Sequence, residues 1–307
     1  MVVVLIIATF FVTFLHAADE AVNPAWQLSA EACITSTFNS FTENWDRSES
    51  GSFLWAARST NIAVKQLSRR LYHENSLKIA FGQTKLQDKE TKKWSSPQKS
   101  TDLIDFETSL KFKLEDFSLK PFLSLRAVSQ FYDTRDPDNC RYANPATFTK
   151  SFGLAKYLLK NPDISWQVRW GGALRCNIDR DAMPYEYTGE EWIKLDRRET
   201  SVITDAGTEL VTEFKMKRGG AGSIAGKLTV FEALARPADL QTAGWRYPDV
   251  SLETIVNINI TRHLIFNYMV QFIFDRETDP DPKIRQAFSA GLSVSLKNEH
   301  FTKGKEK

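Results

Sequence analysis

Long runs of alternating apolar and polar residues dominate this chain after residue 26 and constrain its fold more than any other feature. In residues 164–178, Trp166 and Trp170 belong to an apolar face, whereas Arg169 and Arg175 belong to the opposite, polar face. A period of two residues is that of a β-strand with one apolar and one polar side. The same pattern recurs in three further runs, at 103–114, 249–260 and 286–296.

Runs of this kind predict about twelve strands. They are expected near 28–42, 52–66, 72–87, 101–114, 118–132, 148–160, 163–178, 200–216, 223–235, 249–261, 264–275 and 285–297. These runs are long for a soluble sheet, in which strands average about 5–6 residues. A membrane-spanning β-strand needs about 9–11 residues within the hydrocarbon and more at its ends.

The predicted connections alternate in length. Long ones are expected at 43–51, 88–100, 133–147, 179–199, 236–248 and 276–284, and short ones at 67–71, 115–117, 161–162, 217–222 and 262–263. Short turns at one end and long loops at the other are typical of outer-membrane barrels. The predicted fold is therefore an all-β, transmembrane, antiparallel up-and-down barrel of about twelve strands, with short periplasmic turns and long extracellular loops. An even strand count places both ends of the barrel chain at the short-turn side.

The loop sequences are rich in turn-forming residues, such as Asn161-Pro162-Asp163 in a short connection. Arg236-Pro237 and Asp136-Pro137-Asp138 in the long loops are expected to be solvated rather than part of a core. Tryptophans near strand ends or in loops are expected to form the aromatic girdles of a barrel; they are Trp26, Trp55, Trp94, Trp166, Trp170 and Trp245.

The first residues read as an export signal. An apolar run over 2–15 is too short for a membrane-spanning helix and is followed by small residues at 17–18. We expect a signal peptide at 1–17, a barrel at 18–297 and a charged tail at 298–307.

The composition excludes two classes of protein. A formal net charge of +2 argues against a nucleic-acid binder, and three cysteines argue against a disulfide framework.

Several short stretches resemble the DUF3078 family of outer-membrane β-barrels. They are Phe41-Thr42-Glu43-Asn44-Trp45, residues 77–85, Lys99-Ser100-Thr101-Asp102, Asp205-Ala206-Gly207 and the order of strands from Trp245 to Leu296. The chain departs from the family after Trp45, where members have a Gly-Gly pair, and in its charged carboxyl end. The resemblance implies a Gram-negative outer-membrane location and a barrel fold, with no established activity.

Catalysis is an alternative function, because some twelve-stranded barrels hydrolyse lipids with a serine and a histidine on the outer face. His73 and His263 are predicted beside short turns and His300 in the tail, away from the outer leaflet. No metal-binding spacing of Cys or His appears. The prediction is therefore a non-enzyme without catalytic residues, metal or cofactor; a lipid-modifying enzyme and a soluble secreted sandwich or lipocalin-like binder remain alternatives.

The polar faces of the strands supply the candidate functional residues, which are expected to point into the lumen. They are Asp105, Glu107, Lys111, Lys113, Arg126, Arg169, Arg175, Glu209, Glu213, Lys215 and Glu253. Mixed charges in a barrel of this size predict a salt-bridged structural interior or a narrow path for small polar solutes. Expected partners are outer-membrane lipid and the barrel-assembly machinery, without nucleic acid, and the barrel is expected to be a monomer.

Overall fold

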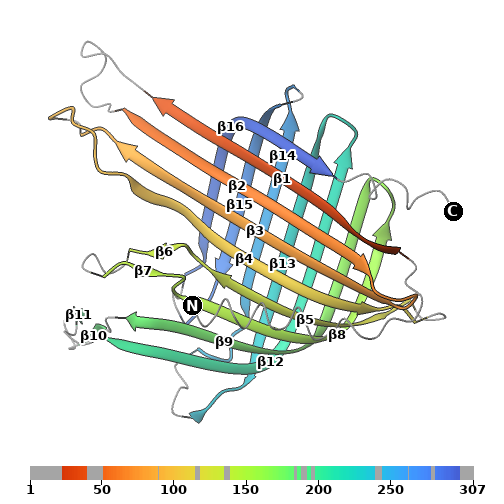
Figure 1. Cartoon of the computed structure of the whole chain (residues 1–307). Coiled ribbons are helices and arrows are strands. Elements are labelled where there is room, and N and C mark those ends of the chain that lie inside the picture. Colours follow the sequence, from red (N-terminus) through yellow and green to blue (C-terminus); the bar gives the residue numbers. More distant parts are fainter. Residues whose placement is uncertain are drawn as a thin grey trace.

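The computed structural model is a closed, antiparallel barrel of twelve strands (Figure 1). It describes residues 23–39, 51–88, 90–114, 118–134, 139–182, 185–187, 192–194, 198–238, 244–261, 263–277 and 281–297. The predicted fold class and strand number are confirmed. The predicted signal peptide at 1–17, the tail at 298–307 and His300 lie outside the described residues.

The strands of the wall follow the chain and then close on themselves. They are β1 (Asn23–Asn39), β2 (Ser52–Gln66), β3 (Leu71–Leu86), β4 (Gln98–Phe112), β5 (Lys120–Ser129), β8 (Ala146–Lys160), β9 (Ile164–Ala182), β12 (Glu199–Arg218), β13 (Gly222–Ala235), β14 (Asp249–Asn259), β15 (Leu264–Phe274) and β16 (Lys283–Lys297). Each pairs with its sequence neighbour in this series, and β1 pairs with β16.

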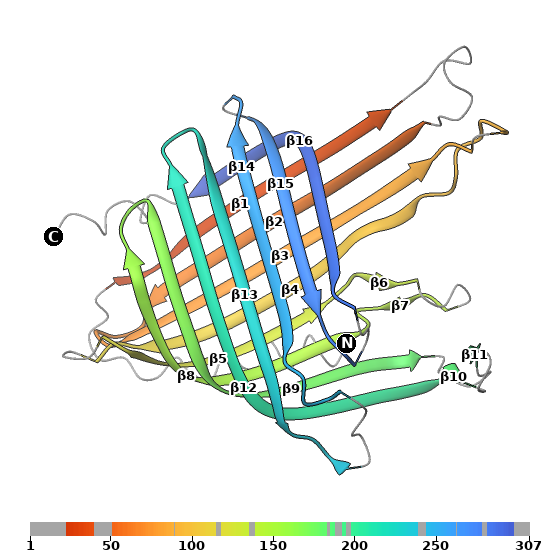
Figure 2. The same ribbon diagram turned by 180° about the vertical axis from the view of Figure 1, so that it is seen from behind.

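Two long connections carry hairpins of their own, which the sequence patterns did not predict. They are β6 (Tyr132–Asp133) with β7 (Arg141–Tyr142), and β10 (Tyr185–Tyr187) with β11 (Trp192–Lys194). Both lie beyond the same end of the barrel in Figures 1 and 2. Two- and three-residue strands are too short for an alternating pattern to stand out. No helix in the described ranges is long and apolar enough to cross a membrane.

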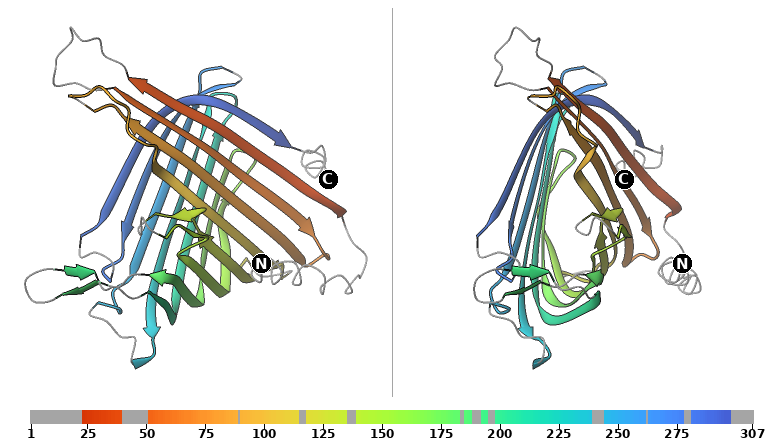
Figure 3. Two further views of the ribbon diagram at one scale, coloured as in Figure 1. Left: turned by 60° about the vertical axis from the view of Figure 1, so that its left-hand side comes forward. Right: turned by 90° about the vertical axis from the view of Figure 1, so that its left-hand side faces the viewer.

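The barrel is flattened, with the early strands forming one wall and the late strands the other (Figure 3, right). Glycines facing inward mark the two corners where the walls meet. Gly153 pairs with Gly171 between β8 and β9, and a Cβ added to Gly171 would lie 2.0 Å from the backbone oxygen of Phe152. At the opposite corner a Cβ on Gly291 of β16 would lie 2.1 Å from the backbone oxygen of Ile34. Only glycine permits these close backbone approaches.

Strand β16 closes the barrel by changing its partner along its length. Its residues from Lys283 to Leu292 pair with β15, whereas those from Gly291 to Lys297 pair with β1. The change falls at the Gly291 corner. The first residue of β1 and the last residue of β16 both lie at the short-turn end, since Asn23 pairs beside the β2–β3 turn and Lys297 pairs with Ser29 of β1.

Apolar side chains form continuous rows around the outside of the barrel. One row follows residues paired across six strands, namely Leu154, Trp170, Leu210, Val230, Val250 and Phe274. Trp170 is 61% exposed and Phe288, on β16, is also 61% exposed. A soluble monomer rarely exposes so large a contiguous apolar surface. Lipid is the solvent in which this outer face is stable.

Two predictions about the loops are wrong. Trp245 belongs to no exposed girdle: it is buried with Phe231 and Ala233 in an apolar cluster at the long-loop end. Arg236, predicted to be solvated, is also buried and forms ion pairs with Asp205 and Glu277. These hydrogen-bonded carboxylates raise the pKa of the Arg236 guanidinium, so it stays charged. The sequence did not predict this burial, because the charge of Arg236 is compensated by residues from two other segments, Asp205 and Glu277.

Candidate functional site: the charged lumen

Ion pairs between strands that are not neighbours show which side chains occupy the lumen. Nη1 of Arg169, on β9, lies 2.6 Å from a carboxylate oxygen of Glu107, on β4, although β5 and β8 stand between these strands. In a closed barrel such a contact crosses the interior. Because side chains alternate along a strand, the other odd-numbered residues of β9 share the inward face with Arg169.

The centre of the lumen holds four charges that touch one another, which we name the central network: Glu107, Arg169, Glu213 and Lys227. Nζ of Lys227, on β13, lies 3.1 Å from Glu107 and 3.4 Å from Glu213. A guanidinium nitrogen of Arg169 lies 3.9 Å from Glu213. Two cations thus share two carboxylates, which satisfies the requirement that buried charges be paired.

Further ion pairs flank the central network along the barrel. Arg126 donates two hydrogen bonds, of 2.8 and 2.9 Å, to the carboxylate of Asp105 on the neighbouring strand. Lys78, on β3, reaches across the lumen to Glu253 on β14 at 3.4 Å. Towards the short turns, Nζ of Lys111 lies 2.7 Å from Glu74 and donates to Gln167 at 3.3 Å. The two walls are therefore linked by charged side chains at several levels.

The remaining predicted residues lie further from this network. Glu209 and Lys215, on β12, are near enough to act electrostatically on Arg126 and Glu74 respectively. Lys113 lies just beyond the end of β4 and is exposed. Arg175 forms an ion pair with Asp249 at the long-loop end instead.

Sequence reasoning missed three participants, namely Glu74, Lys78 and Lys227. The signal was present, because Glu74 and Lys78 share one polar face of the run 72–87 and Lys227 lies between apolar neighbours in the run 223–235. Their partners could not be found in this way, because alternation gives the face of a strand and not the strand opposite.

Water reaches some of these charges inside the barrel. The side chains of the Lys78–Glu253 pair are 32% and 23% exposed. By contrast Arg169 is 8% exposed and its partner Glu107 14%. Solvated charges thus flank a tighter central contact, and the interior is neither a dry core nor a wide channel.

The long-loop mouth is narrowed by aromatic and charged side chains. The Arg175 guanidinium lies 3.7 Å from the centre of the Phe231 ring, and Phe231 is 1% exposed. Arg236 lies over the ring of Trp245 at 5.8 Å. A cavity of about 180 Å³ beside Arg175 is also lined by Asp249 and Asp275.

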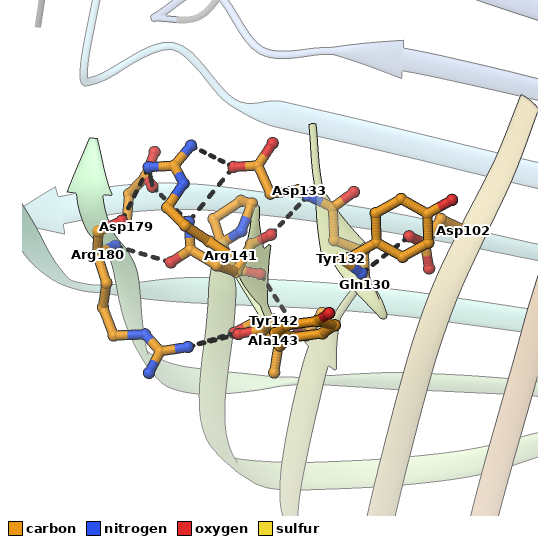
Figure 4. Close-up of polar contacts among 12 residues, drawn as sticks. Asp102, Gln130, Tyr132, Asp133, Arg141, Tyr142, Ala143, Asp179 and Arg180 are labelled. Carbon is orange, nitrogen blue, oxygen red and sulfur yellow. Dashed lines mark hydrogen bonds and ion pairs between the residues drawn. The ribbon is translucent and has the colours of Figure 1, made fainter. Parts of the chain in front are cut away.

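The β6–β7 hairpin is fixed to the rim by a cluster of buried polar groups (Figure 4), which we name the hairpin cluster. Arg141 pairs with Asp133 at 2.5 Å and donates to the backbone oxygen of Arg180 at 2.8 Å. Asn144 donates to Asp179 at 2.8 Å and accepts from the Arg180 amide at 2.7 Å. Asp133 is 1% exposed and Asn144 is fully buried, so the described parts of this loop are packed at the mouth.

His73 and His263, two of the three histidines considered for catalysis, lie beside short turns as the topology predicted. His73 is the third residue of β3, next to a short turn, and its Nε2 lies 2.9 Å from the Thr108 hydroxyl. His263 lies in the short connection between β14 and β15. Cys33, Cys140 and Cys176 are free thiols.

Comparison with known proteins gives similar folds and no family. No protein-family model matches the sequence, and no curated protein matches it. The barrel is similar to an outer membrane channel from Pseudomonas putida F1, at 10% identity and a TM-score of 0.42, over 92% of this chain and 98% of that one.

Two further solved structures show the same kind of likeness. The NanC porin is 8% identical, with a TM-score of 0.38, over 87% of this chain and all of that one. The translocator domain of the autotransporter NalP from Neisseria meningitidis is 8% identical, with a TM-score of 0.37, over 92% of this chain and 90% of that one. The resemblance to DUF3078 therefore stays a prediction. What the structure shows is the fold class, a closed β-barrel with an apolar outer wall.

Proposed function

We propose that this protein is an outer-membrane β-barrel of a Gram-negative cell that lets small polar solutes pass through a narrow, charged lumen. It would be exported by its signal peptide, inserted by the barrel-assembly machinery and active as a monomer. The apolar outer rows support the membrane location. The solvated charges of the lumen support the passage.

The observation that carries the proposal is the Lys78–Glu253 pair. Its atoms meet across the lumen at 3.4 Å, yet both side chains keep about a quarter or more of their surface exposed, at 32% and 23%. A charged pair with water beside it leaves room for small hydrated solutes. Paired charges are also easily separated in water, because the attraction of exposed ions is about 0–1 kcal/mol.

Planar-bilayer recording with the purified full chain tests the proposal. We expect small, steady conductance steps, and a larger conductance in Lys78→Met, because the substitution removes a cross-lumen contact. Lys85→Met is the matched control: Lys85 is on the same strand but seven residues away, so its side chain faces outward. A conductance that rises equally in both variants would contradict a path beside Lys78.

The buried central network favours a second candidate, a closed barrel with a structural role. That function predicts no conductance in the natural sequence, in Lys78→Met or in Arg169→Gln. Heat-modifiable migration in gels would show in each case that the barrel is folded. A mature chain that stays monodisperse without detergent would contradict both candidates.

A further inference from the structure

Two lysines lie over the ring of one tyrosine at the short-turn end of the lumen, and a third acts electrostatically on one of them. Lys120 begins β5, Lys160 ends β8, and Lys113 follows the last residue of β4. Tyr157 lies on β8, three residues before Lys160. We name these four residues the lysine cluster. None of them takes part in the central network.

Strand register shows that Tyr157, Lys160 and Lys120 face the interior. Tyr157 pairs with Gln167, whose side chain accepts a hydrogen bond from Lys111 inside the lumen. Lys160 pairs with Ser165, which shares the inward face of β9 with Gln167. Lys120 pairs with Ala155, two residues from Tyr157 on the same face of β8.

Two ammonium groups contact the ring of Tyr157. Nζ of Lys160 lies 4.7 Å from the ring centre, and Nζ of Lys120 lies 5.2 Å from it. Both distances are within cation–π range. The ring attracts both cations but supplies no compensating negative charge.

Among the described residues, no ion pair balances the like charges of this cluster. Lys120 experiences the positive charges of Lys160, Lys111 and Lys113. Lys111 is neutralised by Glu74 at 2.7 Å. In the part of the chain that the structure describes, no carboxylate forms an ion pair with Lys113, Lys120 or Lys160. This contrasts with the centre of the lumen, where each cation touches an acid.

We infer that the lysine cluster is a binding site for an oxyanion, namely a phosphate or a carboxylate group. Such an anion would lie beside the Tyr157 ring, within reach of the ammonium groups of Lys120 and Lys160. Lysine binds phosphate as a flexible point charge, so a site of this kind needs no rigid fork of donors. The anion would offset the repulsion among the lysines. The site does not depend on whether the barrel conducts.

Calorimetric titration of the purified full chain in non-ionic detergent with inorganic phosphate tests the inference. We expect saturable binding at one site, weakened at least ten-fold in Lys120→Gln and in Lys160→Gln. Lys156→Gln is the matched control: Lys156 is an exposed residue of β8 that pairs with Val168 on the outward face. It should bind phosphate like the natural sequence, and heat-modifiable migration should show that all variants fold.

A second titration distinguishes a free anion from a lipid headgroup. Detergent micelles containing phosphatidylglycerol are compared with micelles containing phosphatidylcholine. Loss of phosphate binding only with phosphatidylglycerol, or binding of that lipid alone with the same lysine dependence, assigns the site to lipid headgroups. Absence of saturable binding by phosphate and by phosphatidylglycerol overturns the inference, as does equal weakening in Lys156→Gln.

Discussion

Lys227 and Glu107 lie on opposite walls of the barrel, with their charged groups 3.1 Å apart. Four strands, β12, β9, β8 and β5, separate them along the shorter way round the wall. The contact therefore measures how closely the walls approach. It also joins the late and early parts of the chain through the lumen.

Removing the shared carboxylate should loosen this contact. In Glu107→Gln, Arg169 and Lys227 lose a charged acceptor and keep the ion pairs with Glu213, so the repulsion between the two cations is less compensated. A charged hydrogen bond contributes about 1.5–3 kcal/mol. We expect the free energy of unfolding in detergent to fall by about that amount. If Glu107→Gln and Lys227→Met each destabilise but the double variant shows no coupling, the two side chains do not interact.

Reversing the central charge should change ion selectivity. Arg169→Glu replaces one of two cations in the central network by a third acid. The central network then becomes negative and should favour cations. The reversal potential in a salt gradient measures this shift. Arg246→Glu, a substitution of an exposed arginine in a long loop, serves as the control, and an equal shift there would exclude a specific role for Arg169.

The corner glycines should be intolerant of side chains. In Gly171→Ala the added Cβ would lie 2.0 Å from the backbone oxygen of Phe152, so the β8–β9 corner must open. Overpacking of this kind costs on the order of 1–3 kcal/mol. Gly220→Ala is the control, since nothing lies within 4 Å of its Cβ position. Urea denaturation in lipid vesicles compares them, and equal stability would refute the corner role.

A charged side chain introduced on the outer face should destabilise the barrel more, the deeper it lies in the bilayer. Leu154, paired with Trp170 in the middle of β8, is 40% exposed, and Leu154→Arg should destabilise the barrel by about 2–4 kcal/mol in bilayers. Leu159 is 48% exposed beside the short turn, and Leu159→Arg should cost about 0–1 kcal/mol. Equal costs would mean that β8 does not cross the bilayer as its register indicates.

The hairpin cluster should protect its loop from proteases. Arg141→Met leaves the buried carboxylate of Asp133 without its 2.5 Å partner, at a cost of about 1.5–3 kcal/mol. The β6–β7 hairpin should then open more often. Limited proteolysis should therefore cleave the chain faster between β6 and β7. The control is Arg246→Met, in another long loop. Unchanged cleavage of Arg141→Met would show that Arg141 does not hold the hairpin.

The wall strands could be predicted because alternation is a local property of each run. The predicted strand at 52–66 coincides with β2. β9 continues to Ala182, four residues past the predicted end, because its last residues pair with β12 beyond the apolar band. Strands of this kind end where pairing ends, and pairing involves a partner far away in the sequence.

The candidate site could be predicted only as a set of inward faces. Asp105, Glu107 and Arg169 were identified because each lies opposite apolar neighbours in its own strand. Their contacts depend on the flattening of the barrel, which brings the early and late strands close together (Figure 3). Burial of Arg236 and Asn144 likewise depends on loops that meet only in the folded chain. A single-strand pattern contains no information about these distances.

The change of partner along β16 determines how the barrel would come apart. Seven residue pairs join β1 to β16, whereas fourteen join β1 to β2. Force applied to the ends of the chain would therefore separate the β1–β16 seam before the β1–β2 junction. Among the described residues, the β1–β16 seam has the fewest residue pairs of any junction in the wall, and it begins at Gly291.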